Sequence, residues 1–155
     1  MSINWKCKTF DELSVHELYA ILRLRTEVFV VEQKCVFQDM DNKDQSSYHI
    51  CGWSDADELI AYTRLVPAGV SYEEASIGRV ITAPSARGTG AGKALMEYSI
   101  NKLYEVWGRQ SIKLGAQLYL KKFYESFGFA QTSDIYIEDG IPHIEMLFPI
   151  LEAKP

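Results

Sequence analysis

The chain has 155 residues, 47% of them hydrophobic, which suits one domain with a full core over 1–155. Its formal net charge of −5 and its scattered Lys and Arg side chains argue against a nucleic-acid partner. No apolar run approaches the ~20 residues that cross a bilayer, and the N-terminus lacks a signal-peptide pattern, so we expect a cytoplasmic protein with no membrane partner.

The first half of the chain predicts a helix followed by a hairpin. Ser14 and Glu17 form a capping box that starts an amphipathic helix. Helical spacing of apolar residues continues to Phe29, and a break before Val30 is one option. A polar loop at 38–47 then leads to two antiparallel strands at 49–53 and 59–66.

The second half alternates strands and helices. It predicts a strand at 75–82, a helix at 91–107, a strand at 112–116, a helix at 119–127, and a closing hairpin of 130–137 and 144–148. Gly128 is placed to end the last helix as its C′ residue. Asp139-Gly140 is a strong signal for the hairpin turn.

The polar loop and the cysteines give no support for a metal site. An EF-hand needs an acidic or amide side chain at its fifth place and glycine at its sixth, where this loop has Lys43 and Asp44. Asp39 and Asp41 could recognise a basic acceptor or could simply be solvated. The chain has three widely spaced cysteines, Cys7, Cys35 and Cys51, and none belongs to a Cys-x-x-Cys pair. We therefore expect all three to be reduced thiols.

A glycine-rich loop joins the 75–82 strand to the following helix. Its residues are Arg87-Gly88-Thr89-Gly90-Ala91-Gly92, followed by Lys93. Glycines let consecutive N–H groups converge on an anion at a helix N-terminus. The Walker pattern fails because Arg87 replaces its first glycine and Ala94 its hydroxyl residue, and the dinucleotide spacing fails as well. The loop is therefore either a phosphate cradle of another kind or an incidental flexible loop.

Two sequence motifs, which follow one another along the chain, indicate a known protein family. Arg-x-x-Gly-x-Gly after a strand, with Pro84 upstream, resembles the acyl-CoA pyrophosphate loop of the GNAT (Gcn5-related N-acetyltransferase) superfamily. Phe123-Tyr124 and Gly128-Phe129 resemble its second cofactor motif, although Gln117 stands where Asn is usual. The segments 24–41 and 139–146 resemble the ElaA-like branch of this superfamily, so that the similarity covers nearly the whole chain.

The resemblance implies an α/β fold with one mixed sheet whose two central parallel strands splay apart to admit acyl-CoA. The arm of the carrier would pair with the free edge of the 77–82 strand, as an added strand does. The implied cofactor contacts are Val80, Ile81 and Thr82 for the arm, Arg87, Gly88, Thr89, Gly90, Ala91, Gly92 and Lys93 for the pyrophosphate, and Gln117 and Tyr124 near the arm and the sulfur.

The resemblance also implies an N-acetyltransferase that uses acetyl-CoA and no metal, acting on a primary amine of a small molecule, peptide or protein. Tyr124 would protonate the departing thiolate. For the base we consider Glu32, whose pKa partial burial would raise, then His143, and more weakly His49. A surface or Arg-paired Glu32 and a structural His143 stay open, as does a homodimer.

Two other functions remain open from the sequence. One is a sensor or recruitment module that binds acyl-CoA without turnover. The other is an acyltransferase with a longer acyl donor, because Val28-Phe29-Val30-Val31-Glu32 resembles the acyl-homoserine-lactone synthases. Pocket volume sets acyl-chain length, and the sequence does not reveal it.

Overall fold

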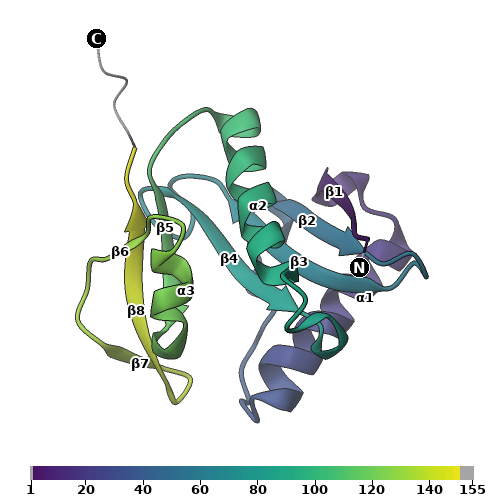
Figure 1. Cartoon of the computed structure of the whole chain (residues 1–155), viewed down its shortest axis with the longest axis horizontal. Coiled ribbons are helices and arrows are strands. Elements are labelled where there is room, and N and C mark those ends of the chain that lie inside the picture. The colour runs from purple at the N-terminus through teal and green to yellow at the C-terminus, as the bar shows by residue number, and fades with distance from the viewer. Residues whose placement is uncertain (1, 151–155) are drawn as a thin grey trace.

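One mixed sheet of eight strands runs through the protein, and helices cover both of its faces (Figure 1). The computed structural model describes residues 2–150. The strands are β1 (Asn4–Thr9), β2 (Tyr48–Trp53), β3 (Leu59–Val66), β4 (Ala75–Thr82), β5 (Ile112–Gln117), β6 (Ala130–Gln131), β7 (Tyr136–Glu138) and β8 (Ile141–Phe148). They follow the order β1-β2-β3-β4-β5-β8-β6, and β7 also pairs with β8.

The helices fall into long and short elements. The longer ones are α1 (Val15–Arg25), the π-helical segment η2 (Thr26–Glu32), α2 (Ala91–Trp107) and α3 (Lys121–Glu125). Single 3₁₀ turns are η1 (Phe10–Glu12), η3 (Asp44–Ser46), η4 (Pro84–Ala86) and η5 (Leu118–Leu120). None of the helices within residues 2–150 has the length and apolar character needed to cross a membrane.

Local signals located most of these elements. The predicted strands at 59–66 and 75–82 and the predicted helix at 91–107 coincide with β3, β4 and α2. The capping box is confirmed, because the Glu17 N–H donates to Ser14 Oγ at 3.0 Å and the Ser14 N–H to Glu17 Oε1 at 2.8 Å. Gly128 has φ +109° at the end of α3, as a C′ glycine should.

Three details differ from the sequence-based prediction. The edge strand β1 was missed, because its alternation of Trp5 and Cys7 with polar residues covers only six positions. The helix does not break before Val30 but widens into a π turn. The predicted strand at 130–137 is interrupted, because Ser133 Oγ accepts the Glu145 N–H at 2.8 Å and replaces a backbone partner.

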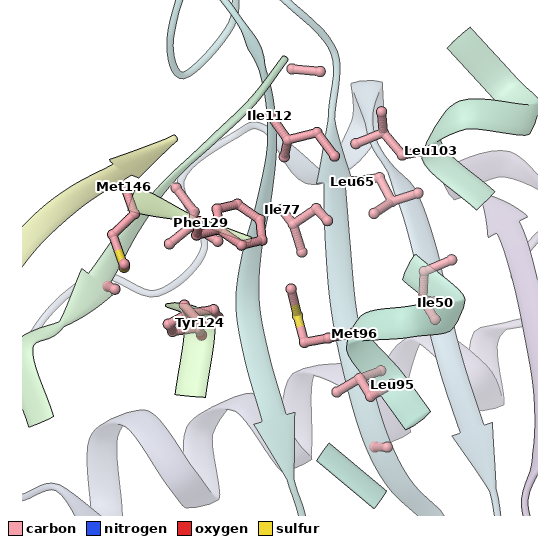
Figure 2. Close-up of a cluster of buried hydrophobic side chains, with 14 of the residues drawn as sticks. Ile50, Leu65, Ile77, Leu95, Met96, Leu103, Ile112, Tyr124, Phe129 and Met146 are labelled. Atoms are coloured by element: carbon pink, nitrogen blue, oxygen red, sulfur yellow. The ribbon is translucent and has the colours of Figure 1, made fainter. Parts of the chain in front are cut away.

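The alternation of β3 side chains builds a core on each face of the sheet. Ile60 and Tyr62 belong to the cluster under α1, whereas Ala61 and Leu65 belong to the cluster under α2 and α3. Figure 2 shows the second cluster, in which side chains of β3, β4 and β5 meet those of α2 and α3.

A β-bulge in β4 changes which face its side chains occupy. Tyr62 and Arg64 of β3 pair with Ile81 and Gly78, so β4 has one more residue between the two pairs than β3. Arg79, inside the bulge, has φ +51°. The extra residue reverses the alternation, since Ile77 packs in the cluster under α2 and Ile81 in the cluster under α1.

The two central parallel strands separate soon after they meet. β4 and β5 pair only through Ala75 with Ile112 and Ser76 with Lys113. Beyond this point β5 continues to pair with β8, no strand of the described residues pairs with the β4 edge from Ile77 to Thr82, and the ribbons of β4 and β5 diverge (Figure 1). The splayed mixed sheet that was predicted is therefore confirmed.

Candidate active site

A cavity of about 740 Å³ occupies the place where β4 and β5 separate. Its walls come from the bulged half of β4, the end of β5, the start of α2, η5 and α3, the segment from η2 through the following loop, and the β7–β8 turn. The cavity therefore connects the face covered by α2 and α3 with the face covered by α1.

Most of the residues predicted for the site line this one cavity. They are Glu32, Val80, Ile81, Thr82, Arg87, Gly92, Gln117, Tyr124 and His143. The other predicted residues, outside the cavity lining, belong to the loop and first turn of α2: Gly88, Thr89, Gly90, Ala91 and Lys93. Segments far apart in the sequence thus meet where the sheet divides.

The glycine loop presents backbone to solvent at the start of α2. Gly90 is the N-cap of this helix with φ +84°, and no side chain caps the helix start within the described residues. A Cβ placed on Gly90 would have no protein atom within 4 Å, so the space beside this backbone is open. Free N–H groups and the positive end of the helix dipole suit an anion here.

Tyr124 is buried beneath the cavity, with a side chain only 4% exposed. Its ring makes edge contacts with Phe123 and Phe129, at centroid distances of 5.2 Å and 6.0 Å. Burial raises the pKa of Tyr124 well above its ordinary value, with a smaller contribution from Tyr119. The phenol therefore carries its proton at neutral pH and is a weaker acid than a free tyrosine.

His143, also in the cavity lining, is held in one orientation. Its Nδ1 lies 2.7 Å from the Ile141 carbonyl oxygen, and because a carbonyl only accepts, Nδ1 carries the proton. Its ring stacks on Tyr136 at 5.8 Å and 24°. The other nitrogen, Nε2, lies 3.6 Å from Glu138 Oε2. The neutral imidazole therefore keeps its lone pair on Nε2.

Glu32 is not in the environment that was expected. Partial burial was wrong, because its side chain is 41% exposed. Of the alternatives, an Arg-paired carboxylate is what the structure contains, but the partner is Arg87 at 2.8 Å rather than Arg25, Arg64 or Arg79. Glu32 and Arg87, which the sequence assigned separately to the base and to the pyrophosphate, thus form an ion pair in the cavity lining.

His49 is a structural histidine. Its Nδ1 is 2.6 Å from the Tyr62 hydroxyl group and its Nε2 is 2.9 Å from the Asp44 carbonyl oxygen. Burial lowers the pKa of His49. The side chain is outside the cavity lining, so it has no access to a ligand there.

The acidic loop is neither solvated nor free to bind a basic acceptor. Asp39 accepts from Arg25 Nε and Arg79 Nε, both at 2.8 Å, and Arg25 is fully buried. Asp41 accepts from both terminal nitrogens of Arg64, at 2.7 Å and 2.8 Å. Asp44 links two of these arginines, through bonds of 2.7 Å to Arg25 and 2.9 Å to Arg64.

This Arg–Asp network fixes the loop to the β4 bulge. Burial alone would raise the pKa of Asp41, but hydrogen bonds and charge from Arg64, with a contribution from Arg79, hold that pKa well below its ordinary value. Within the described residues no three His, Cys, Asp or Glu side chains gather as a metal ion would require.

Two cavity contacts have no signal in the sequence. Gln117 Nε2 donates to Gln33 Oε1 at 3.2 Å, which joins the end of β5 to the segment after η2. The Cys35 thiol donates to the Asp139 carbonyl oxygen at 3.3 Å. Both pairs are separated by more than eighty residues in the chain, so local patterns could not reveal them.

Comparison with known proteins gives a consistent result. A family model described as an acetyltransferase (GNAT) domain matches residues 11–148. Protein ElaA of Escherichia coli is 43% identical over 153 residues, which cover 97% of this chain and 99% of that protein. Its crystal structure superposes with a TM-score of 0.88, covering 94% of this chain and 99% of the other.

Two further solved structures are similar. An acyl-CoA N-acyltransferase from Pseudomonas aeruginosa is 41% identical, with a TM-score of 0.89 and coverage of 94% and 99%. An aminoglycoside 6'-N-acetyltransferase, solved in complex with coenzyme A, has a TM-score of 0.69 and covers 97% of this chain and 99% of its own. At 16% identity this last similarity concerns the fold alone.

Proposed function

The chain belongs to the GNAT acetyltransferase family, and on that premise we propose that it transfers the acetyl group of acetyl-CoA to a primary amine. The observation that carries the proposal is the cavity itself. It joins an unpaired strand edge, the open start of α2 and a protonated buried phenol in one continuous space. We also propose that residues 1–155 act as a single domain.

The chain offers matching groups for the pyrophosphate and the pantetheine arm of acetyl-CoA. The open backbone from Arg87 to Lys93 suits the pyrophosphate. The β4 edge at Val80, Ile81 and Thr82 offers backbone donors and acceptors to the amide-rich arm, and Gln117 lies opposite on β5. No contact in this proposal needs a metal ion.

The proposed chemistry uses three groups of the protein. A backbone N–H of the Val80–Thr82 segment stabilises the oxyanion that forms when the amine nitrogen attacks the thioester carbon. Tyr124 gives its proton to the thiolate as the carbon–sulfur bond breaks. Either Glu32 or His143 takes a proton from the amine, since both line the cavity.

Binding and turnover together test this proposal. We expect calorimetry to show micromolar binding of acetyl-CoA and CoA but not of ATP or NAD, and an amine screen to show thiol release. A preference for ATP or NAD would overturn the cradle assignment. Binding without thiol release for any amine would favour a sensor, and faster release from longer acyl-CoA donors would change the assigned acyl group.

A matched pair of variants tests the cradle. Gly90→Val should abolish acetyl-CoA binding, because a β-branched residue disfavours positive φ and crowds the pyrophosphate. Gly69→Val is the control, since Gly69 lies in the loop between β3 and β4, outside the cavity lining, with φ +86° and equally open space around a Cβ. Equal affinity of the two variants would contradict the assignment.

A further inference from the structure

We propose that His143 and Glu138 form the seat of the acceptor amine, which selects a protonated primary amine whose amine-bearing carbon has no carboxylate. His143 Nε2, rather than Glu32, then removes the proton. This inference rests on the proposed function, because it assigns the acceptor side of the same cavity.

The first observation is that His143 has one free hydrogen-bonding position. Its Nδ1–H is used by the Ile141 carbonyl oxygen, and stacking on Tyr136 fixes the ring plane. The hydrogen bond and the stacking together fix the direction of the Nε2 lone pair. The His143 side chain also lines the cavity. A base needs such a fixed lone pair within reach of its substrate.

The second observation concerns the carboxylates that line the cavity. Glu32 is paired with Arg87, and Asp41 with Arg64. Glu138 has no Lys or Arg partner among residues 2–150, and its Oε2 lies 3.6 Å from His143 Nε2. Glu138 is thus available to a cation, whereas Glu32 is not.

The third observation is that both groups are acceptors. When the imidazole is neutral, its Nε2 and the Glu138 carboxylate each accept a hydrogen bond, and these two acceptors lie 3.6 Å apart. A primary ammonium has three N–H donors and one positive charge, so it can donate to both groups at once. A neutral hydroxyl acceptor has one donor and no charge, so it fits this pair less well.

The seat faces the transfer chemistry. His143 is the Cα partner of Gln117 in the β5–β8 ladder, and Gln117 is the last residue of β5 before the turn that leads to Tyr124. His143, Gln117 and Tyr124 all line the same cavity. An amine at Nε2 therefore lies in the space that the split strands and Tyr124 enclose.

The surroundings define the substrate class. Asp139, next to Glu138, adds a second carboxylate to the cavity wall, while Phe37 and Ile141 add apolar surface. A carboxylate on the amine-bearing carbon would meet like charge at this wall, which is unfavourable, because the cations of the lining come from other segments: Lys43 from the loop before η3, Arg79 from β4 and Arg87 from the loop before α2. Amines attached to an apolar group are accepted, and free α-amino acids are disfavoured.

The proton and bond changes balance. The ammonium gives one proton to Nε2, and the resulting amine forms the carbon–nitrogen bond with the thioester carbon. The carbon–sulfur bond breaks, Tyr124 protonates the thiolate, and the second nitrogen proton restores the phenol. His143 releases its proton to solvent, so an ammonium and a thioester give an amide, a thiol and one proton.

Binding to the seat can be measured without turnover. We would follow the His143 ring resonances by NMR in the CoA-loaded protein at about pH 8, where an ordinary imidazole is neutral and an alkylamine protonated. Addition of 2-phenylethylamine should shift these resonances to saturation, and phenylalanine should not. No response to the amine, or an equal response to the amino acid, would overturn the proposal.

Two carboxylate variants sharpen the test. Glu138→Gln should weaken 2-phenylethylamine binding by about 1.4- to fivefold, the range for one partly exposed ion pair. Asp134→Asn is the matched control, because it removes the same charge from an exposed position before β7 that is outside the cavity lining. Unchanged affinity in Glu138→Gln, or an equal loss in both variants, would refute the role of Glu138.

The outcome is separable from that of the proposed function. If acetyl-CoA binds and the amine reaches His143 but no thiol is released, the transferase proposal fails and the seat stands. If thiol release proceeds and His143 does not respond to the amine, the seat is wrong and the transferase proposal stands.

Discussion

The left-handed backbone of Arg79 provides a test in which glycine and alanine exchange their usual order of stability. Arg79 has φ +51° inside a strand, and its guanidinium donates to Asp39 at 2.8 Å and 2.9 Å. Arg79→Ala and Arg79→Gly both remove these contacts. They differ only in the Cβ atom, so comparison of the two isolates the backbone.

The expected difference follows from two opposing costs. A Cβ in the left-handed region costs about 1–2 kcal/mol, and glycine avoids this cost. Glycine also loses more backbone freedom on folding, which costs about 0.5–1 kcal/mol relative to alanine. Arg79→Gly should therefore be about 1 kcal/mol more stable than Arg79→Ala in urea unfolding.

Lys113 supplies the matched control in an ordinary strand. Its side chain is 23% exposed against 24% for Arg79, it also forms an ion pair, with Glu145 at 3.2 Å, and its φ is not positive. Lys113→Ala should be more stable than Lys113→Gly by about 0.5–1 kcal/mol. If glycine is the less stable residue at both positions, the bulge does not hold Arg79 in a strained conformation and the reasoning is refuted.

Three further predictions concern single residues. Tyr124→Phe should lower turnover about 10- to 1,000-fold with little change in acetyl-CoA affinity by calorimetry; unchanged turnover in the thiol-release assay would reject the acid role. Glu32→Gln should free Arg87 for the pyrophosphate and tighten CoA binding by up to about fivefold, the range for an exposed ion pair. Equal or weaker CoA binding would show that Glu32 and the pyrophosphate do not compete for Arg87. The pKa values of Asp41 and Asp44 are lowered in the folded protein, because hydrogen bonds and ion pairs with arginine outweigh the effect of burial. The two carboxylates therefore stabilise the fold above about pH 4, and this stabilisation is lost as the pH falls below that value. Urea unfolding of Asp41→Asn should accordingly show a smaller stability loss between about pH 6 and pH 3 than the wild type, and an equal loss would exclude Asp41 as a contributor.

Local chemistry in the sequence was sufficient for most of the elements. Ser14 with Glu17 and Asp139 with Gly140 each involve neighbours in the chain, and both were located correctly. Glycine spacing at Gly90 likewise identified the start of α2. The family resemblance added the mixed sheet and the split between its two central parallel strands, which periodicity alone does not give.

Contacts between distant segments were beyond the sequence. Glu32 pairs with Arg87 across fifty-five positions, and no local pattern distinguishes this partner from the other arginines. The sequence did not indicate that Asp39 and Asp41 are paired with arginines, because these three arginines come from distant elements, α1, β3 and β4. The β4 bulge had no signal either, since its positive φ falls on Arg79 rather than on glycine.

The separation of β4 and β5 affects the tendency of the purified protein to self-associate. Among residues 2–150, each strand keeps one inner edge without a strand partner beyond Ser76 and Lys113. Open edges of this kind are templates on which other chains can add strands and aggregate. A pantetheine arm bound along β4 would cover that edge, so under the proposed function the carrier would also protect the protein from self-association, and coenzyme A in the buffer should extend its shelf life at high concentration.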